Sequence, residues 1–123
     1  MRTAEFVLNG QSHLLCFSAR TVRECTERYG DVANIDTALS GDGVKPFDEA
    51  IWLLSSMMAA GDRYAKLMDI YNPPPLSVDG LLDLCDLQDF ANLRGKIAET
   101  ITSGQKTTVE VEPGKNAEAT QGA

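Results

Sequence analysis

The sequence contains a single histidine, His13, among its 123 residues. Acid–base and nucleophilic catalysis most often use a histidine within hydrogen-bond reach of a serine, a cysteine or another partner, and the sequence assigns His13 no such partner. The phosphate-binding motif GxxxxGK[ST] is absent, and Gly41-Asp42-Gly43 is too short for a dinucleotide-binding turn. We therefore expect a protein that is not an enzyme and that uses no cofactor.

Cysteine is scarce as well. Cys16, Cys25 and Cys85 are odd in number, and no two of them have the spacing of metal ligands. Each falls on or next to an expected apolar face, which indicates reduced core thiols, no disulfide framework and no metal site. No apolar stretch follows Met1 as it does in a signal peptide, and the longest apolar run, residues 50–60, is too short to cross a bilayer. The expected location is the cytoplasm.

Positive charge is also in short supply, since 11 Lys and Arg residues against 18 Asp and Glu residues give a formal net charge of −7. Binding to nucleic acid or to an anionic membrane requires many Lys and Arg side chains, so neither partner is expected. Arg20, Arg23 and Arg28 do fall on one predicted helix. Ion pairs one turn apart, Arg20–Glu24, Arg23–Glu27 and Glu24–Arg28, are expected to neutralise them.

A run of carboxylates recurs every three or four residues at Asp79, Asp83, Asp86 and Asp89. This spacing permits a cation site, because carboxylate oxygens are ligands for Ca²⁺. A solvated helix face with acidic residues in the first turn explains the same pattern and is the preferred interpretation.

The N-terminal residues predict a β-hairpin over residues 5–17. Asn9-Gly10 is typical of a two-residue type I′ turn, because both central positions of that turn need a positive φ. Such a loop fixes the register, so Leu8 faces Gln11, Phe6 faces His13 and Ala4 faces Leu15. The face assigned to the core carries Phe6, Leu8, Leu15 and Phe17.

Five helices are expected after the hairpin, because apolar residues recur there at helical spacing. Ser18 and Ser77 are favourable N-caps, and Gly30 is a fitting helix terminator. Gly61 indicates a kink or a close packing point within the longest helix. The helices are expected over about residues 19–29, 32–39, 46–69, 78–85 and 87–103.

The remaining segments complete an α+β fold, in which the hairpin packs on a mainly helical domain. Residues 72–75, Asn-Pro-Pro-Pro, predict an extended connector. Residues 107–112, TTVEVE, alternate in polarity and favour a C-terminal strand at the edge of the hairpin. Residues 113–123 are poor in apolar side chains and predict a mobile tail. Residues 1–112 are thus expected to form one globular domain.

An excess of apolar side chains marks the longest predicted helix. Met side chains adapt to varied surfaces, and aromatic side chains often anchor interfaces. The residues are therefore candidates for binding a partner, although a helix with two core-facing sides explains them equally well. They are Trp52, Met57, Met58, Tyr64, Met68 and Tyr71.

The order of these features resembles the short tail-assembly chaperones of tailed phages and prophages of Gram-positive bacteria. That family has a strand pair on a tight turn, a short arginine-containing helix ending in glycine, another short helix, a long apolar helix and a final helical segment. The matching stretches read FVLNG at residues 6–10, FSARTVRE at 17–24 with YG at 29–30, and FDEAIWLL at 47–54. The resemblance covers about residues 5–104.

The resemblance implies a cytoplasmic protein of a bacterial host cell that binds the tape-measure protein before the tail polymerises. It also raises the tail-tube protein as a second partner, leaves a homo-oligomer open, and implies no active site. Two other classes of function stay open at this point. An acidic regulatory or inhibitor protein that mimics DNA predicts salt-sensitive binding to a basic partner, and a small enzyme predicts a pocket holding several perturbed ionisable groups.

Overall fold

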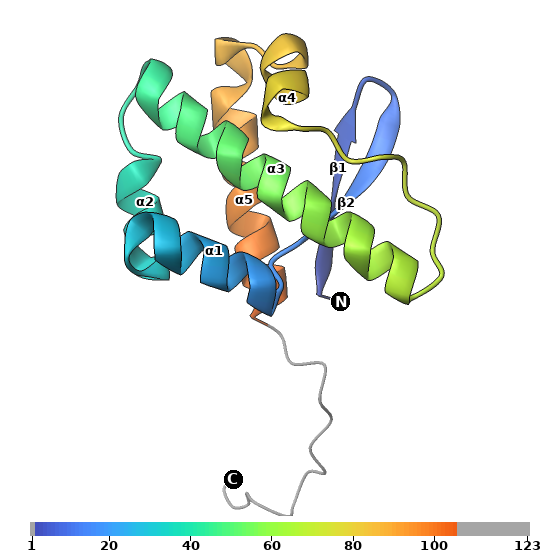
Figure 1. Ribbon diagram of the computed structural model, residues 1–123. Helices are drawn as coiled ribbons and strands as arrows, with labels where there is room; N and C mark the ends of the chain where they lie inside the picture. The colour runs from blue at the N-terminus through green and yellow to red at the C-terminus, as the bar shows by residue number, and fades with distance from the viewer. Residues whose placement is uncertain (1, 106–123) are drawn as a thin grey trace, which may run out of the picture.

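The computed structural model describes residues 2–105, which fold as an N-terminal two-stranded antiparallel hairpin packed against five helices (Figure 1). The predicted α+β class and its helical majority are confirmed. The expected edge strand at residues 107–112, the domain end at 112 and the tail at 113–123 lie outside the described residues.

The elements in order are β1 (Thr3–Leu8), β2 (Gln11–Cys16), α1 (Ala19–Tyr29), a 3₁₀ turn (Val32–Asn34), α2 (Ile35–Ala38), α3 (Val44–Leu67), α4 (Val78–Leu84), a second 3₁₀ turn (Leu87–Asp89) and α5 (Phe90–Gly104).

The hairpin has the register that its turn predicts. Asn9 and Gly10 both have positive φ, 52° and 75°, and Phe6 pairs with His13 while Ala4 pairs with Leu15. Phe6 and Leu15 are buried on the core side, whereas Val7 on the opposite side is exposed. The register therefore places the apolar face of the hairpin on the helices, as expected from the sequence.

Helix α3 is the central element, because it contacts β2, α5, α4 and α1. Figure 1 shows it running diagonally across the front of the molecule, with α5 behind it. Its side chains Leu53, Leu54, Met57 and Met58 are completely buried between the hairpin and the other helices. The two apolar sides of α3 are thus largely used within the fold itself.

Helix α3 packs closely on the hairpin at Gly61. A Cβ atom added there would overlap the Leu14 carbonyl oxygen of β2. Glycine is therefore required at this crossing, because only a residue without a side chain lets the two backbones approach so closely. The sequence indicated a kink or a close packing point at Gly61, and the structure identifies a close packing point.

The end of α3 is fixed by a left-handed residue. Asp69 has φ 56°, the Ile70 amide donates to the Ala65 carbonyl at 2.8 Å, and the Asp69 amide donates to the Lys66 carbonyl at 3.4 Å. This pair of bonds is the Schellman arrangement, which satisfies carbonyls at a helix end and reverses the chain. The helix ends two residues earlier than the sequence predicted, since Leu67 is its last residue.

The connector after α3 is tied to both the helix and the hairpin. The Asn72 side-chain oxygen accepts a 2.9 Å hydrogen bond from the Leu14 amide, and Ser55 donates to the Leu76 carbonyl at 3.2 Å. Residues 70–77 form no helix or strand, and the interruption of the helix that the prolines predict is confirmed. These bonds hold the connector against β2.

The contact at Gly61 leads to the first prediction. Gly61→Ala should lower the free energy of unfolding by about 2 kcal/mol or more, because overpacking against a rigid backbone forces α3 away from β2. Gly95→Ala is the matched control, because Gly95 lies within α5 and an added Cβ there meets nothing within 4 Å. The control should stabilise the protein by roughly 0.5–1 kcal/mol through helix propensity. Urea unfolding of both variants measures this, and equal stabilities would contradict the assigned contact.

Candidate functional site

The six candidate binding residues divide into three groups by exposure. Met57 and Met58 are completely buried, so in this fold they are core side chains with no surface to offer a partner. Trp52 and Tyr64 are half-buried, while Met68 and Tyr71 are exposed. The helical period could not separate these groups, because residues on both apolar sides of α3 look alike until the other helices are placed against them.

Trp52 is engaged inside the molecule. The Arg28 guanidinium lies 4.4 Å from the Trp52 ring centroid, and the Tyr29 ring meets Trp52 edge-on at 6.0 Å between centroids. Glu49 joins the group by accepting from Arg28 Nε at 2.9 Å and from the Tyr29 hydroxyl at 2.7 Å. The hydrogen bond from Arg28 lowers the pKa of the Glu49 carboxyl, and burial raises the pKa of the Tyr29 hydroxyl. This cluster fixes α1 to α3.

The ion pairs expected along α1 do not form. Within the described residues, Arg28 pairs with Glu49 of α3 rather than with Glu24, and neither Arg20 nor Arg23 lies within 4.0 Å of a carboxylate oxygen. A bidentate, partly buried partner on another helix holds Arg28 better than an exposed residue one turn away. The predicted ion pairs along α1 were therefore wrong, and of the three arginines only Arg28 is paired with a carboxylate within the described residues.

Four exposed apolar side chains gather where α3 ends, and we call them the helix-end patch. They comprise the last residue of α3, its cap and two residues of the connector: Leu67 (85% exposed), Met68 (55%), Ile70 (46%) and Tyr71 (84%). Sequence reasoning found Met68 and Tyr71 but missed Leu67 and Ile70. The Asn-Pro-Pro-Pro segment was the available signal for these two residues. Its prolines end the helix nearby, so the apolar residues just before them do not belong to a continuing helix face.

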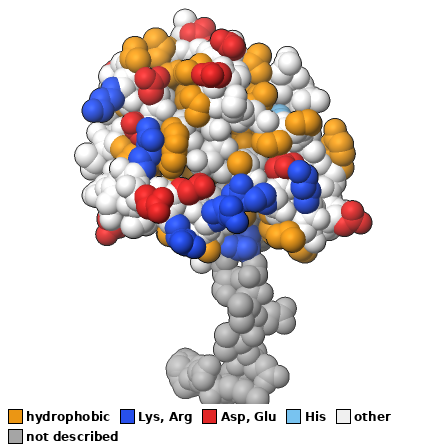
Figure 2. Space-filling view, in the orientation of Figure 1, with side chains coloured by type: hydrophobic (Ala, Val, Ile, Leu, Met, Phe, Trp, Pro, Cys, Tyr) orange, Lys and Arg blue, Asp and Glu red, His pale blue; other side chains and the backbone are white. Residues whose placement is uncertain are grey.

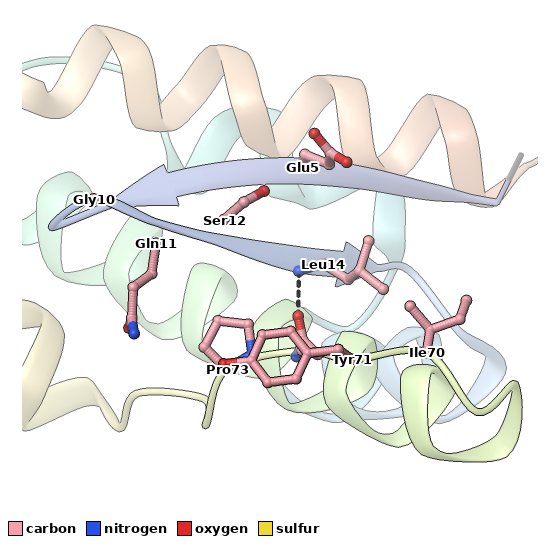
Figure 3. A pocket seen from close by; sticks show the side chains of 9 residues that line it. Glu5, Gly10, Gln11, Ser12, Leu14, Ile70, Tyr71 and Pro73 are labelled. Atoms are coloured by element: carbon pink, nitrogen blue, oxygen red, sulfur yellow. Dashed lines mark hydrogen bonds between the residues drawn. The ribbon is translucent and has the colours of Figure 1, made fainter.

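A groove of about 470 Å³ adjoins the helix-end patch (Figure 3). Its two sides are the turn half of β2, including Ser12 and Leu14, and the connector residues Tyr71 and Pro73. Asn72 joins the two sides, because its side-chain oxygen accepts a 2.9 Å hydrogen bond from the Leu14 amide. Figure 3 draws this bond as the dashed line at Leu14. Among the described residues, the only titratable side chains that line it are Glu5 and Tyr71. This lining favours binding of a polypeptide over acid–base chemistry.

His13 lies on the core face of the hairpin and is only 2% exposed. Its Nδ1 atom is buried and has no hydrogen-bond partner among the described residues. Burial lowers the pKa of His13 below its ordinary value of 6.5, since the charged ring would lose its hydration. The histidine is a neutral core residue in this position, opposite Phe6.

In the described part of the chain, no group of three or more His, Cys, Asp or Glu side chains converges in a way that would hold a metal ion. The carboxylates of residues 79–89 instead include a local cap, because the Asp86 amide donates to Asp89 Oδ2 at 2.8 Å. Within residues 2–105, no helix has the length and apolar character needed to cross a membrane.

Comparison of the chain with models of protein families, with characterised proteins and with solved structures found no significant match.

The buried histidine generates the second prediction. Because its pKa is lower in the folded chain, the unfolded chain binds more protons below pH 6.5, so the contribution of His13 to stability is complete above that pH and is lost on acidification. The free energy of unfolding should fall between about pH 7.5 and about pH 5.5. His13→Leu should flatten this dependence, because it removes the titrating ring. Urea midpoints at both pH values test this, and an equally steep fall in the variant would contradict it.

Proposed function

We propose that this protein is a tail-assembly chaperone of a phage or prophage that binds apolar helical segments of the tape-measure protein before the tail polymerises. The observation that supports it best is the helix-end patch, four adjacent apolar residues presented to solvent at the end of the central helix. The sequence resemblance to such chaperones provides the identity of the partner, and the patch provides a surface of suitable chemistry. The tail-tube protein is a second proposed partner.

The composition of the patch suits a helical apolar ligand. Tyr71 supplies a large rigid aromatic surface, and Met68 supplies an adaptable one, which are properties of residues that dominate binding energy. Leu67 and Ile70 add aliphatic area next to them. An amphipathic helix that lays its apolar face on the helix-end patch would bury part of this exposed apolar area.

Rigid presentation of the patch lowers the cost of binding. The bonds of the Schellman turn hold Ile70 and Asp69 at the helix end, and Asn72 is bonded to Leu14. Lys66 adds an ion pair of 3.0 Å with Asp62, one turn earlier in the helix. Less conformational freedom is therefore lost when a partner binds, which favours affinity.

The area needed for a stable complex extends beyond the patch. A stable interface buries roughly 800 Å² on each partner, which is more than four side chains provide. The adjoining groove along Ser12, Leu14 and Pro73 offers the additional surface in continuity with Tyr71. We therefore place the tape-measure segment across both the helix-end patch and the groove.

The third prediction tests the patch with a double variant, Met68→Ser/Tyr71→Ser. Binding of the tape-measure protein encoded in the same tail operon should weaken at least about tenfold, because about 1.4 kcal/mol is lost for each factor of ten and both side chains are exposed anchors. Calorimetric titration after co-expression measures the affinity. Folding should be unchanged, since neither side chain belongs to the core.

The matched control is Leu84→Ser/Leu87→Ser, which alters two other exposed apolar side chains in and after α4, 47% and 52% exposed. The control should bind as the unaltered chain does. Equal binding by both double variants, or no binding by the unaltered chain, would refute the proposal. Binding to a basic protein that disappears at high salt would instead favour the acidic inhibitor hypothesis.

A further inference from the structure

A second hollow, of about 290 Å³, lies between the end of β2, the start of α1 and the C-terminal half of α3. We call it the arginine hollow, because Arg2, Arg20 and Arg63 line it. Its apolar lining includes Ala60 and Leu67 of α3, with the half-buried Tyr64 beside them. The hollow thus combines positive charge with an apolar floor.

The three arginines have no acidic partner within the described residues. The Arg63 Nη2 atom is moreover buried and forms no hydrogen bond with any described residue. A buried donor without a partner costs free energy, and a guanidinium is best satisfied by a carboxylate. The formal net charge of the chain is −7, so three unpaired arginines around one hollow are an exception to its overall acidity. They favour the binding of an acidic ligand.

The space-filling view agrees with this concentration of charge. Figure 2 shows Lys and Arg side chains gathered in the lower middle of the face, where Figure 1 has the start of α1 beside the C-terminal half of α3. Asp and Glu side chains border this group and are also scattered over the rest of the same face. The basic surface is therefore local, and the overall acidity of the chain does not reveal it.

The last described helix brings the chain to this hollow. Gly104, the final residue of α5, is packed so tightly on Phe17 that an added Cβ would lie 2.6 Å from the Phe17 Cβ atom. Phe17 directly precedes Ser18, which lines the hollow together with Arg20. Three residues extend at most about 10 Å, so residue 107 is no farther than that from Gly104 and its contact with Phe17.

Residues 107–112 have the chemistry that the hollow requires. Their sequence is TTVEVE, and in an extended chain Val109 and Val111 share one side while Glu110 and Glu112 share the other. Carboxylates two residues apart in a strand are separated by about 7 Å, which allows each to meet a different arginine. The two valines then face the apolar floor.

We propose that residues 107–112 of this same chain bind in the arginine hollow as an extended segment, with Glu110 and Glu112 paired to the arginines and the valines packed on α3. This assignment differs from the edge-strand position expected from the alternation alone, because charge complementarity selects the hollow. It does not depend on the identity of any other partner. The chain supplies its own acidic ligand for a basic site that its fold creates.

The fourth prediction concerns amide hydrogen exchange, which is measured on the full-length chain by mass spectrometry at low salt. Amides of residues 107–112 should exchange at least about tenfold more slowly than in a synthetic peptide of the same sequence. Arg20→Glu and Glu110→Lys/Glu112→Lys should each restore the peptide rate, and combining them should recover part of the protection by exchanging the charges. Arg23→Glu is the matched control, because Arg23 lies on the same helix outside the arginine hollow, and it should leave the protection unchanged.

Three results would overturn the proposal. The first is exchange at the peptide rate in the unaltered full-length chain. The second is protection that survives charge reversal at Glu110 and Glu112, a double variant that changes no residue of the folded part described here and so keeps the test valid if Arg20→Glu fails to fold. The third is protection that vanishes on dilution, because it would place the segment on another copy of the chain.

Discussion

The fold depends on the crossing of α3 over β2 at Gly61. An isolated two-stranded hairpin is only marginally stable in water, so β1 and β2 need a helix packed directly against them. The absence of a side chain at Gly61 brings α3 onto the Leu14 carbonyl, and the completely buried Leu53, Met57 and Met58 fill the space along the same helix. The amide of Leu14 is taken by Asn72, so the same residue of β2 positions both the helix and the connector that follows it.

Local signals in the sequence were enough to predict most of the secondary structure. Asn9-Gly10 determined the hairpin register because a two-residue turn permits only one pairing. Ser18 and Ser77 cap α1 and α4 by accepting from the amides of Thr21 and Gly80. Each of these features depends on residues within four positions of one another, so it can be predicted from the sequence without knowledge of the tertiary structure. The end of α3 was placed two residues late, because Asp69 adopts a positive φ that is unusual for a residue other than glycine.

Features that depend on distant residues were not predictable in the same way. Arg28 pairs with Glu49 rather than with Glu24 because it donates two hydrogen bonds to Glu49, which also accepts from Tyr29, while Trp52 packs on the guanidinium. These contacts exist only after α1 packs on α3. Of the candidate binding residues, Met57 and Met58 went into the core, while Met68 and Tyr71 stayed at the surface. Helical spacing assigns a residue to a face, but the packing of the neighbouring helices decides whether that face is covered.

Net charge is a poor guide to where charge is placed. The formal net charge of −7 argued against nucleic-acid and membrane partners, yet the unpaired Arg20 beside Arg2 and Arg63 forms a local basic surface within an acidic molecule. Leu67 connects this surface to the proposed chaperone site, because it lines the arginine hollow and also belongs to the helix-end patch. A segment bound in the hollow would cover part of Leu67, and a partner bound on the patch would need the same side chain. The two proposed ligands would therefore weaken each other's binding, with a coupling that by linkage is equal in both directions.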